Sequence, residues 1–356
     1  LNTAFLVSPP SRHQSVAILA QDAIVKFTQE WHTSSLLCAM GPLIPALAAL
    51  FLGTTATPMI FKGLMTRAPQ YNAIWAVLHP IHGLLLYTAV LGAVQPPKSR
   101  RAFRPLHALP VSILFGLYNV MKSGCGKGTG VPGIVVHLTD QLEPLAVMCL
   151  SLATGARRSF PSTQWAGAAC LLLASSWYIF GDAAAALDVK SHSQLGLCVA
   201  KNVPLAAAFM YVEWIVKTAF PCLFPTVLWW WVCLFQMFTT LVPAYYQFNP
   251  EDVDGLSFVS FLRSGVACYW LGTPEATCSG MPIGNAGVVI FGGMMNLAMP
   301  VIARHGGAPM MMVRAASLPF VAFLFTCPSL VGDRAEDLDT QRCLSLLLAA
   351  LALLLW

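Results

Sequence analysis

Long apolar runs separated by short polar connections are the dominant pattern of this sequence. Windows of roughly 20 apolar residues, the length with which an α-helix crosses the hydrocarbon core of a bilayer, recur along the whole chain. A strand in lipid would leave backbone groups unpaired, so each run is predicted to be helical, with kinks at its internal prolines. The ten expected spans cover residues 36–60, 73–94, 106–121, 134–153, 165–181, 199–220, 226–247, 284–303, 309–327 and 341–356.

Composition agrees with this pattern. Of the 356 residues, 57% are hydrophobic and only 10% are charged, which is too little polar surface for a soluble globular protein. We therefore expect an all-α integral membrane protein whose surroundings are the lipid bilayer. The net charge of +5 is modest and no basic run is interleaved with aromatic residues, so nucleic acid is not expected as a partner.

The charges between the expected spans are sorted by sign. With the N-terminus in the cytosol, the bias of basic residues that sets membrane orientation is largely respected. Most of the carboxylates, including those of the long loop 249–283, then fall on the opposite side. The cytosolic connections hold no acid and contain Lys98, Arg100, Arg101, Arg104, Arg157, Arg158 and Arg304.

Residues 1–32 precede the first span. Between His13 and Trp31, apolar positions recur at helical spacing and Asp22 and Lys26 are four residues apart, a pattern typical of an amphipathic helix on a membrane surface. The remnant of a targeting leader is the alternative interpretation.

The two halves of the chain share a pattern of Phe-Gly, Asn, a Gly/Pro turn and a late proline. Because each copy would hold five spans, an odd number, the copies would enter the membrane from opposite sides, as in the inverted repeats of many secondary transporters. We expect one repeat over 33–181 and another over 195–356. The matching positions are Phe115, Gly116, Asn119, Pro132 and Pro144 in the first copy, and Phe291, Gly292, Asn296, Pro309 and Pro319 in the second.

Acidic residues inside apolar spans are the candidate functional groups, because a charge in lipid is costly and persists for a reason. His137, Asp140 and Glu143 are spaced i, i+3 and i+6, which places them on one side of a single continuous helix. Carboxylates and a histidine in a poorly solvated cavity exchange protons near physiological pH, which suits proton-coupled transport. The alternative is a buried polar network that only ties helices together.

A base in the ninth span is the expected partner of these acids. Arg314 lies five residues before Pro319, as Thr139 lies five before Pro144, so pseudo-symmetry would turn the two helices toward each other. We expect Arg314 to pair with Asp140 or Glu143 and a zwitterionic substrate to exchange with that pair. A permanent structural ion pair is the alternative.

Several segments in the second half are similar to the chloroquine-resistance-transporter-like family of the drug/metabolite transporter superfamily. They are PLAAAFMYVEWIVK at 204–217, LFQMFTT at 234–240, VACYWLG at 266–272 ahead of Cys278, and MNLAMPVIA at 295–303. The resemblance implies ten helices in two inverted five-helix repeats. It implies a carrier of amino acids, small peptides, thiol peptides or cationic drugs across a vacuolar or lysosomal membrane, or a plastid envelope, with proton coupling in several members.

The same resemblance assigns further residues. It places an acid at Glu213 beside the cavity, although Glu213 and Lys217, four apart, also suit a simple intrahelical ion pair. Asn296 matches a polar family position, and Gln236 and Thr239 are secondary cavity candidates; helix packing is the alternative for all three. The family has cysteines at Cys268 and Cys278 and others that this chain lacks, so these two either bond each other or stay free.

Other classes of function fit less well. No HExxH motif, histidine cluster or nucleophile constellation is present, so neither an enzyme nor a metal or other cofactor is expected. A channel would need a repeated pore-lining ring. The nearest alternative is a nucleotide-sugar or triose-phosphate carrier of the same superfamily. We expect a monomer whose partners are protons, a small-molecule substrate and the bilayer.

Overall fold

The computed structural model describes residues 43–96, 98–126, 132–156, 159–180, 189–220, 223–248, 255, 257–273, 276–305, 308–327, 338 and 340–355. The chain divides at Pro45 into an N-terminal unit and a unit from Ala46 to Trp356, which holds all but the first three residues of the described helices. The amphipathic helix expected between His13 and Trp31 lies outside the described residues.

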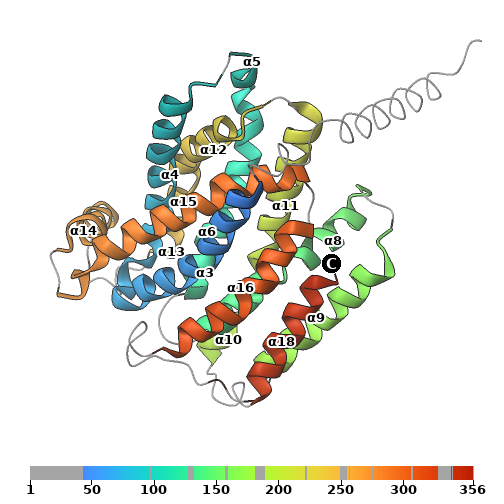
Figure 1. The fold of residues 1–356 in the computed structure, drawn as a ribbon. Helices are drawn as coiled ribbons and strands as arrows, with labels where there is room; N and C mark the ends of the chain where they lie inside the picture. Colours follow the sequence, from blue (N-terminus) through green and yellow to red (C-terminus); the bar gives the residue numbers. More distant parts are fainter. Residues whose placement is uncertain are drawn as a thin grey trace, which may run out of the picture. The chain divides into compact units, whose positions relative to one another are not determined.

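The described residues are organised in helices, with no strand among them (Figure 1). The first part of the chain forms α3 (Leu43–Arg67), α4 (Asn72–Val94), the short α5 (Lys98–Arg101), α6 (Ala108–Gly126), α7 (Gly133–Asp140), α8 (Glu143–Ala153) and α9 (Ser162–Phe180). The second part forms α10 (Val189–Ala200), α11 (Asn202–Trp214), the π-helical turn η4 (Ile215–Ala219), α12 (Pro225–Thr239), α13 (Leu241–Gln247), α14 (Phe258–Leu271), α15 (Met281–His305), α16 (Ala308–Thr326) and α18 (Thr340–Leu354). Short 3₁₀ turns are η1 (Pro69–Tyr71), η2 (Pro105–His107) and η6 (Ala276–Cys278).

Within the described part of the chain, five helical segments are long and apolar enough to cross a membrane. The expected all-α fold is therefore present, and its helices are compatible with a membrane protein. Shorter apolar helices cover Phe258–Leu271, Met311–Thr326 and Thr340–Leu354. The five long segments are Leu43–Leu64, Ala73–Val94, Gly133–Ala153, Ser193–Ala219 and Ala276–Met299.

Prolines break three of the apolar segments at the same offset. A proline has no N–H, and its ring collides with the carbonyl group four residues earlier, so a helix tends to end there. Each of the three helices ends four residues before a proline, and the next helix begins two or three residues later. The breaks follow Asp140 before Pro144, Ala200 before Pro204, and Thr239 before Pro243. The prediction of one continuous fourth helix carrying His137, Asp140 and Glu143 was therefore wrong: α7 and α8 are separate.

Packing pairs helices that are far apart in the sequence. α4 lies along α12, and α9 lies along α18, which also contacts α16. α6 contacts α4, α10, α11 and α12, and so occupies a central position among them. α14 packs on α4 and α15, and the apolar spacing of residues 259–271 in the sequence is typical of such an amphipathic helix.

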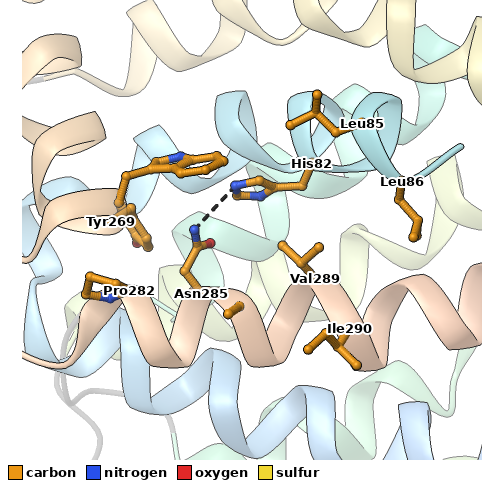
Figure 2. A pocket seen from close by; sticks show the side chains of 10 residues that line it. His82, Leu85, Leu86, Tyr269, Pro282, Asn285, Val289 and Ile290 are labelled. Carbon is orange, nitrogen blue, oxygen red and sulfur yellow. Dashed lines mark hydrogen bonds between the residues drawn. The ribbon is translucent and has the colours of Figure 1, made fainter. Parts of the chain in front are cut away.

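The two histidines of the second span lie within α4, which continues through Pro80. The ring of His79 stacks on that of Trp75, with 4.7 Å between the centroids. The Nε2 atom of His82 lies 3.3 Å from the side-chain nitrogen of Asn285 in α15 (Figure 2). Each histidine thus has a neighbour that accounts for its place in an apolar helix.

Among the cysteines that the structure describes, four buried ones form two disulfides. One links Cys268 at the end of α14 to Cys278 in η6, the pairing that the family resemblance implies. The other links Cys125 in α6 to Cys198 in α10 and was not expected from the sequence. The second bridge closes the larger loop, since its cysteines are 73 residues apart and those of the first are 10 apart.

We expect the Cys125–Cys198 bridge to stabilise the protein more than Cys268–Cys278. In the chain-entropy account, a loop of 73 residues is worth about 4 kcal/mol and one of 10 residues about 3 kcal/mol. The double variant Cys125→Ala/Cys198→Ala should therefore show the larger fall in apparent Tm in detergent, measured beside Cys268→Ala/Cys278→Ala as a matched control. An equal or smaller fall would contradict this ranking.

Candidate functional site

A cavity of about 160 Å³ lies among α3, α4, α6, α7, α8, α11, α12, α15 and α16. α9 and α18 contribute no lining residue. Of the residues singled out in the sequence, His137, Asp140, Glu143, Gln236, Asn296 and Arg314 all line it. The structure therefore brings together side chains from both halves of the chain around one central space.

Buried polar atoms without a hydrogen-bond partner are concentrated in this cavity. A buried donor or acceptor that is left unpaired costs about 1–3 kcal/mol, so a cluster of such atoms is typical of a place that receives a polar guest. Among the lining residues they are Thr57 Oγ1, Trp75 Nε1, His137 Nδ1, Gln141 Oε1, Trp229 Nε1 and Arg314 Nη1.

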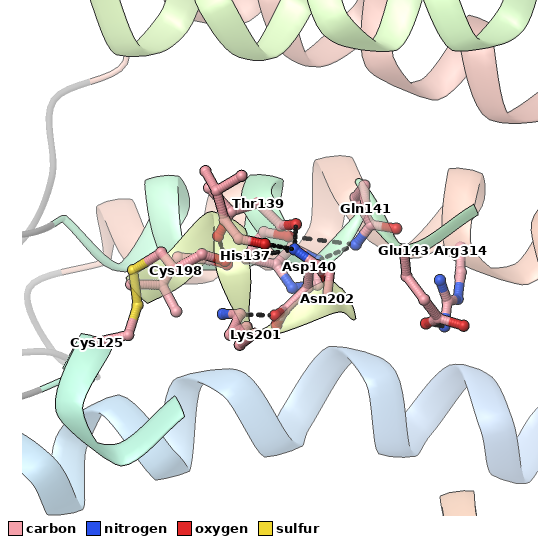
Figure 3. A network of polar contacts seen from close by, with 12 residues as sticks. Cys125, His137, Thr139, Asp140, Gln141, Glu143, Cys198, Lys201, Asn202 and Arg314 are labelled. Atoms are coloured by element: carbon pink, nitrogen blue, oxygen red, sulfur yellow. Dashed lines mark hydrogen bonds and ion pairs between the residues drawn. A yellow bond between two sulfur atoms is a disulfide. The ribbon is translucent and has the colours of Figure 1, made fainter. Parts of the chain in front are cut away.

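Asp140 forms an ion pair with Lys201, at 2.7 Å between Oδ1 and Nζ (Figure 3). Lys201 is the residue between α10 and α11, and its side chain is fully buried, whereas that of Asp140 is 20% exposed toward the cavity it lines. The pair thus joins the break after α7 to the break after α10. Removing one partner of such a buried pair leaves an uncompensated charge, at a cost of about 3–5 kcal/mol.

A side-chain amide reinforces the same junction. Asn202 donates from Nδ2 to the backbone carbonyl of Thr139, at 2.9 Å, and to the carbonyls of Val199 and Cys198 at 3.0 and 3.3 Å. These carbonyls lie at the ends of α7 and α10, where backbone acceptors lose their helical partners. On the neighbouring turn, the Cys125–Cys198 disulfide ties α10 to α6.

Glu143, the first residue of α8, pairs with Arg314 of α16. Their side chains are 6% and 13% exposed, so the pair is buried within the protein and borders the cavity. Of the two partners expected for Arg314, the structure selects Glu143, because Lys201 already neutralises Asp140. Figure 3 shows the two ion pairs on either side of the turn that contains Gln141.

His137 lies one turn before this break. Its Nε2 is 3.5 Å from Nε2 of Gln141, which also donates to the His137 carbonyl at 3.3 Å. The other ring nitrogen, Nδ1, faces the cavity lining without a described partner. His137, Asp140 and Glu143 share one cavity, as expected from their spacing, although the helix that carries them is broken.

Lys122 of α6 lines the cavity together with Arg314. Its ammonium group lies over the rings of Phe61 and Tyr118, 5.2 and 5.5 Å from their centroids. No acid within the described ranges forms an ion pair with it. Cation–π contacts hold such a side chain in place without neutralising its charge.

Two of the expected site residues lie elsewhere. Glu213 pairs with Lys217 at 2.6 Å, both side chains are about half exposed, and neither lines the cavity. The intrahelical ion pair therefore accounts for Glu213, and the expectation that it lies beside the cavity was wrong. Thr239 is 3.3 Å from the hydroxyl of Ser112 and is likewise absent from the lining, so it links α12 to α6.

The sequence did not lead us to two lysines of this region. Lys201 pairs with Asp140, and Lys122 lines the cavity. Lys201 is at the edge of the sixth apolar run, where a charged residue can be mistaken for part of the loop that connects two spans. The signal was available, since the rule that a charge in a span needs a partner applies to bases as well as acids. If Lys201 had been counted among the charges inside a span, Asp140 would have been predicted as its acidic partner.

No three histidine, cysteine or acidic side chains gather as a metal site in the part of the chain that the structure describes. Comparisons of the sequence with protein-family models and with curated proteins gave no match.

The Asp140–Lys201 pair should behave as one energetic unit. We expect Lys201→Met alone to lower the apparent Tm in detergent sharply, because it leaves Asp140 buried and unpaired, and the double variant Asp140→Asn/Lys201→Met to recover most of the loss. The matched control is Glu213→Gln/Lys217→Met, an exposed pair worth about 0.5 kcal/mol, which should shift Tm little. Additive effects of the two single substitutions would refute the coupling.

Proposed function

We propose that this protein is a secondary active transporter that moves a small zwitterionic metabolite across an organelle membrane by alternating access, coupled to protons. The single observation that carries the proposal is the central cavity, which holds two ion pairs and a cluster of unpaired polar atoms among apolar helices. Polar and ionic groups at that depth are typical of substrate and ion pathways. The proposed activity is transport, not chemical catalysis.

The proposed fold is ten transmembrane helices. The five long apolar segments supply half of them. Each of the others lies at an expected span and packs among the long segments. They would be supplied by α6, α9, α16, α18 and, as one span, α12 with α13. This count gives each half of the chain five spans.

The packing supports an inverted repeat. A twofold relation between the halves would pair the second span with the seventh and the fifth with the tenth, and these are the neighbours α4 with α12 and α9 with α18. It would also turn the fourth span toward the ninth, where Glu143 meets Arg314. The same arrangement characterises the chloroquine-resistance-transporter-like family, to which we propose the chain belongs.

The size and the polar lining of the cavity favour a small substrate that carries both a positive and a negative charge. Its volume of about 160 Å³ is below the roughly 300–1,000 Å³ usual for drug-sized ligands. Arg314 Nη1 and Lys122 offer donors to a carboxylate, while Glu143 and the Gln141 Oε1 atom offer acceptors to an ammonium group. Amino acids and small peptides carry both groups.

Proton coupling is proposed to involve His137 and Glu143. Both line the cavity, and a carboxylate that trades its arginine partner for a proton changes the charge that the substrate meets. Asp140 is less suited to this role because Lys201 holds it from a fully buried position.

The two disulfides bear on orientation. Cys125 is near the end of α6, Cys198 is within the first turns of the sixth span, and Cys268 and Cys278 precede α15. In the proposed topology all four lie toward the non-cytosolic side, where an oxidising lumen allows disulfides to persist. A vacuolar or lysosomal type of membrane, with a plastid envelope as the alternative, fits this placement.

A phosphate-linked carrier is the second candidate function. Lys122 and Arg314 both line the cavity, and together they provide the paired cations that such a carrier needs for an anionic substrate. The sequence alone had placed no lysine near Arg314. The presence of these two cations among the lining residues is the specific observation that favours this candidate.

Replacing the Glu143–Arg314 pair should strongly reduce transport while the protein still folds. We expect Arg314→Met/Glu143→Gln, which leaves no unpaired charge, to reduce uptake about tenfold to hundredfold, the range for lost hydrogen bonds to charged groups. Uptake of radiolabelled amino acids, dipeptides and phosphate into proteoliposomes, with and without a pH gradient, is the measurement. Glu213→Gln/Lys217→Met is the matched control and should transport normally.

Full uptake by the Arg314→Met/Glu143→Gln variant would contradict the role of this pair. Uptake that persists unchanged when an ionophore collapses the pH gradient would contradict proton coupling. Phosphate exchange in place of amino-acid uptake would favour the second candidate.

Lys122 should discriminate between substrates that carry a carboxylate and those that do not. We expect Lys122→Met to raise the KM of an amino acid about tenfold and to leave that of its decarboxylated amine unchanged, because only the former meets the lysine charge. Competition uptake with the two compounds measures both. Lys217→Met, an exposed lysine outside the cavity, is the control, and an equal change for the two substrates would argue against a carboxylate subsite.

A further inference from the structure

A second cavity, of about 330 Å³, opens between α4, α14 and α15 (Figure 2). Its rim contains side chains that are largely uncovered: Leu85 is 57% exposed, Ile290 58% and Trp270 45%. Both α4 and α15 belong to segments that are long and apolar enough to cross a membrane. The open side of this groove, which we call the α4–α15 groove, would therefore face lipid hydrocarbon.

The groove contains two unpaired polar atoms in otherwise apolar walls. Asn285 is 5% exposed and Tyr269 is fully buried, yet Asn285 Oδ1 and the Tyr269 hydroxyl have no described hydrogen-bond partner. Both residues line the groove, and Figure 2 shows them close to each other beside Pro282. An apolar groove without a polar guest would leave both groups at a cost of about 1–3 kcal/mol each.

The imidazole of His82, another polar group of the groove, is already engaged. His82 contacts the Asn285 side-chain nitrogen at 3.3 Å, and its ring lies 5.2 Å from that of Trp270. That contact occupies the nitrogen of the Asn285 amide and leaves the oxygen as an acceptor. Burial raises the pKa of the Tyr269 phenol above its ordinary value, so the phenol remains protonated and able to donate.

The groove continues inward toward the central cavity. A small cavity of about 20 Å³ shares His82, Leu86 and Val289 with the groove. It also shares His79 and Asn296, among others, with the central cavity, and all of its lining comes from α4 and α15. The indentation is therefore part of the space between these two helices and not a shallow dent in the surface.

Close approach at the inner end limits what can pass. A Cβ atom added to Gly293 would lie 2.4 Å from a methyl carbon of Leu86, so a larger residue there would force the two helices apart or move Leu86. A volume of about 20 Å³ holds little more than one water molecule. A guest of the groove therefore stays on the lipid side of Leu86.

The chemistry of the lining restricts the class of molecule that can bind in the groove. No acidic or basic side chain other than His82 lines the groove, so a charged headgroup would have no counter-charge. A hydroxyl group donates and accepts at once, and so one hydroxyl can meet both the Asn285 oxygen and the Tyr269 phenol. The leucine, valine and isoleucine side chains suit an apolar body.

We propose that the α4–α15 groove binds an uncharged amphiphile from the bilayer, with a compact apolar body and a single hydroxyl group held by Asn285 and Tyr269. The proposal depends on α4 and α15 being embedded in lipid, but not on transport. Failure of the uptake experiments would leave it intact, and its own failure would leave the transport proposal intact.

The test uses the purified full chain in lipid nanodiscs with a photoactivatable sterol, an apolar alcohol, and with the methyl ether of the same sterol. We expect the alcohol to label peptides that contain 266–272 and 282–290, and the ether to label them about threefold to tenfold less, the range for a lost hydrogen bond. Labelling is quantified by peptide mass spectrometry.

Two variants test the assigned atoms separately. Asn285→Leu and Tyr269→Phe should each lower labelling by the alcohol toward the level of the ether, and Tyr245→Phe, on exposed α13, should not. Labelling spread over other lipid-facing helices, or equal labelling by alcohol and ether on the unaltered protein, would overturn the proposal. The comparison of the two probes does not require any variant to fold.

Discussion

The ion pair between Asp140 and Lys201 is the interaction on which the centre of this protein depends. Lys201 is fully buried and lies 2.7 Å from the carboxylate, in a region where neither charge alone is tolerable. The pair also sits where two helices are interrupted, at the ends of α7 and α10. One contact therefore neutralises two charges and fixes the relative position of two broken segments.

Proline makes these interruptions, and the interruptions explain where the polar residues are. By ending a helix four residues earlier, Pro144 and Pro204 place Asp140 and Lys201 at or beside helix ends, where backbone groups also need partners. The amide of Asn202 supplies one such partner to Thr139. In lipid, non-helical backbone is tolerated only where protein or a cavity covers it, so the breaks and the polar cluster require each other.

Much of the fold was accessible from hydrophobic pattern alone, because in lipid the length of an apolar run dictates both helix and position. The helical character of the runs and the helix α14 followed directly from the sequence. Residues such as Asp140 and Arg314 were identifiable because a charge in an apolar run is conspicuous, and both line the central cavity.

The hydrophobic pattern could not predict which side chains pair with one another across the chain. The choice of Glu143 over Asp140 as the partner of Arg314 depends on Lys201, whose depth only packing reveals. The Cys125–Cys198 bridge connects α6 to α10 with no local signal in the sequence. The helix break at Gln141 was foreseeable from Pro144, but the length of the apolar run 134–153 made one span the simpler prediction.

The two ion pairs differ in a way that matters for the proposed carrier. Both connect residues of the first expected repeat to residues of the second, yet their surroundings are unequal. Lys201 is fully buried, is seated next to Asn202, and lies one turn from the disulfide at Cys198, so this corner is held by ionic, hydrogen-bonded and covalent links together. Arg314 is 13% exposed at the cavity and keeps Nη1 unpaired.

In alternating access, one contact between the halves must persist as a pivot while another must open. The Asp140–Lys201 corner has the rigidity of a pivot, because Lys201 is fully buried and breaking such a pair costs about 3–5 kcal/mol. The Glu143–Arg314 pair has a substrate-accessible face, and a zwitterion that replaces each partner's counter-charge lets the two side chains separate without leaving either charge bare. In the proposed carrier, this difference in burial would let the Glu143–Arg314 pair open while the Asp140–Lys201 pair holds.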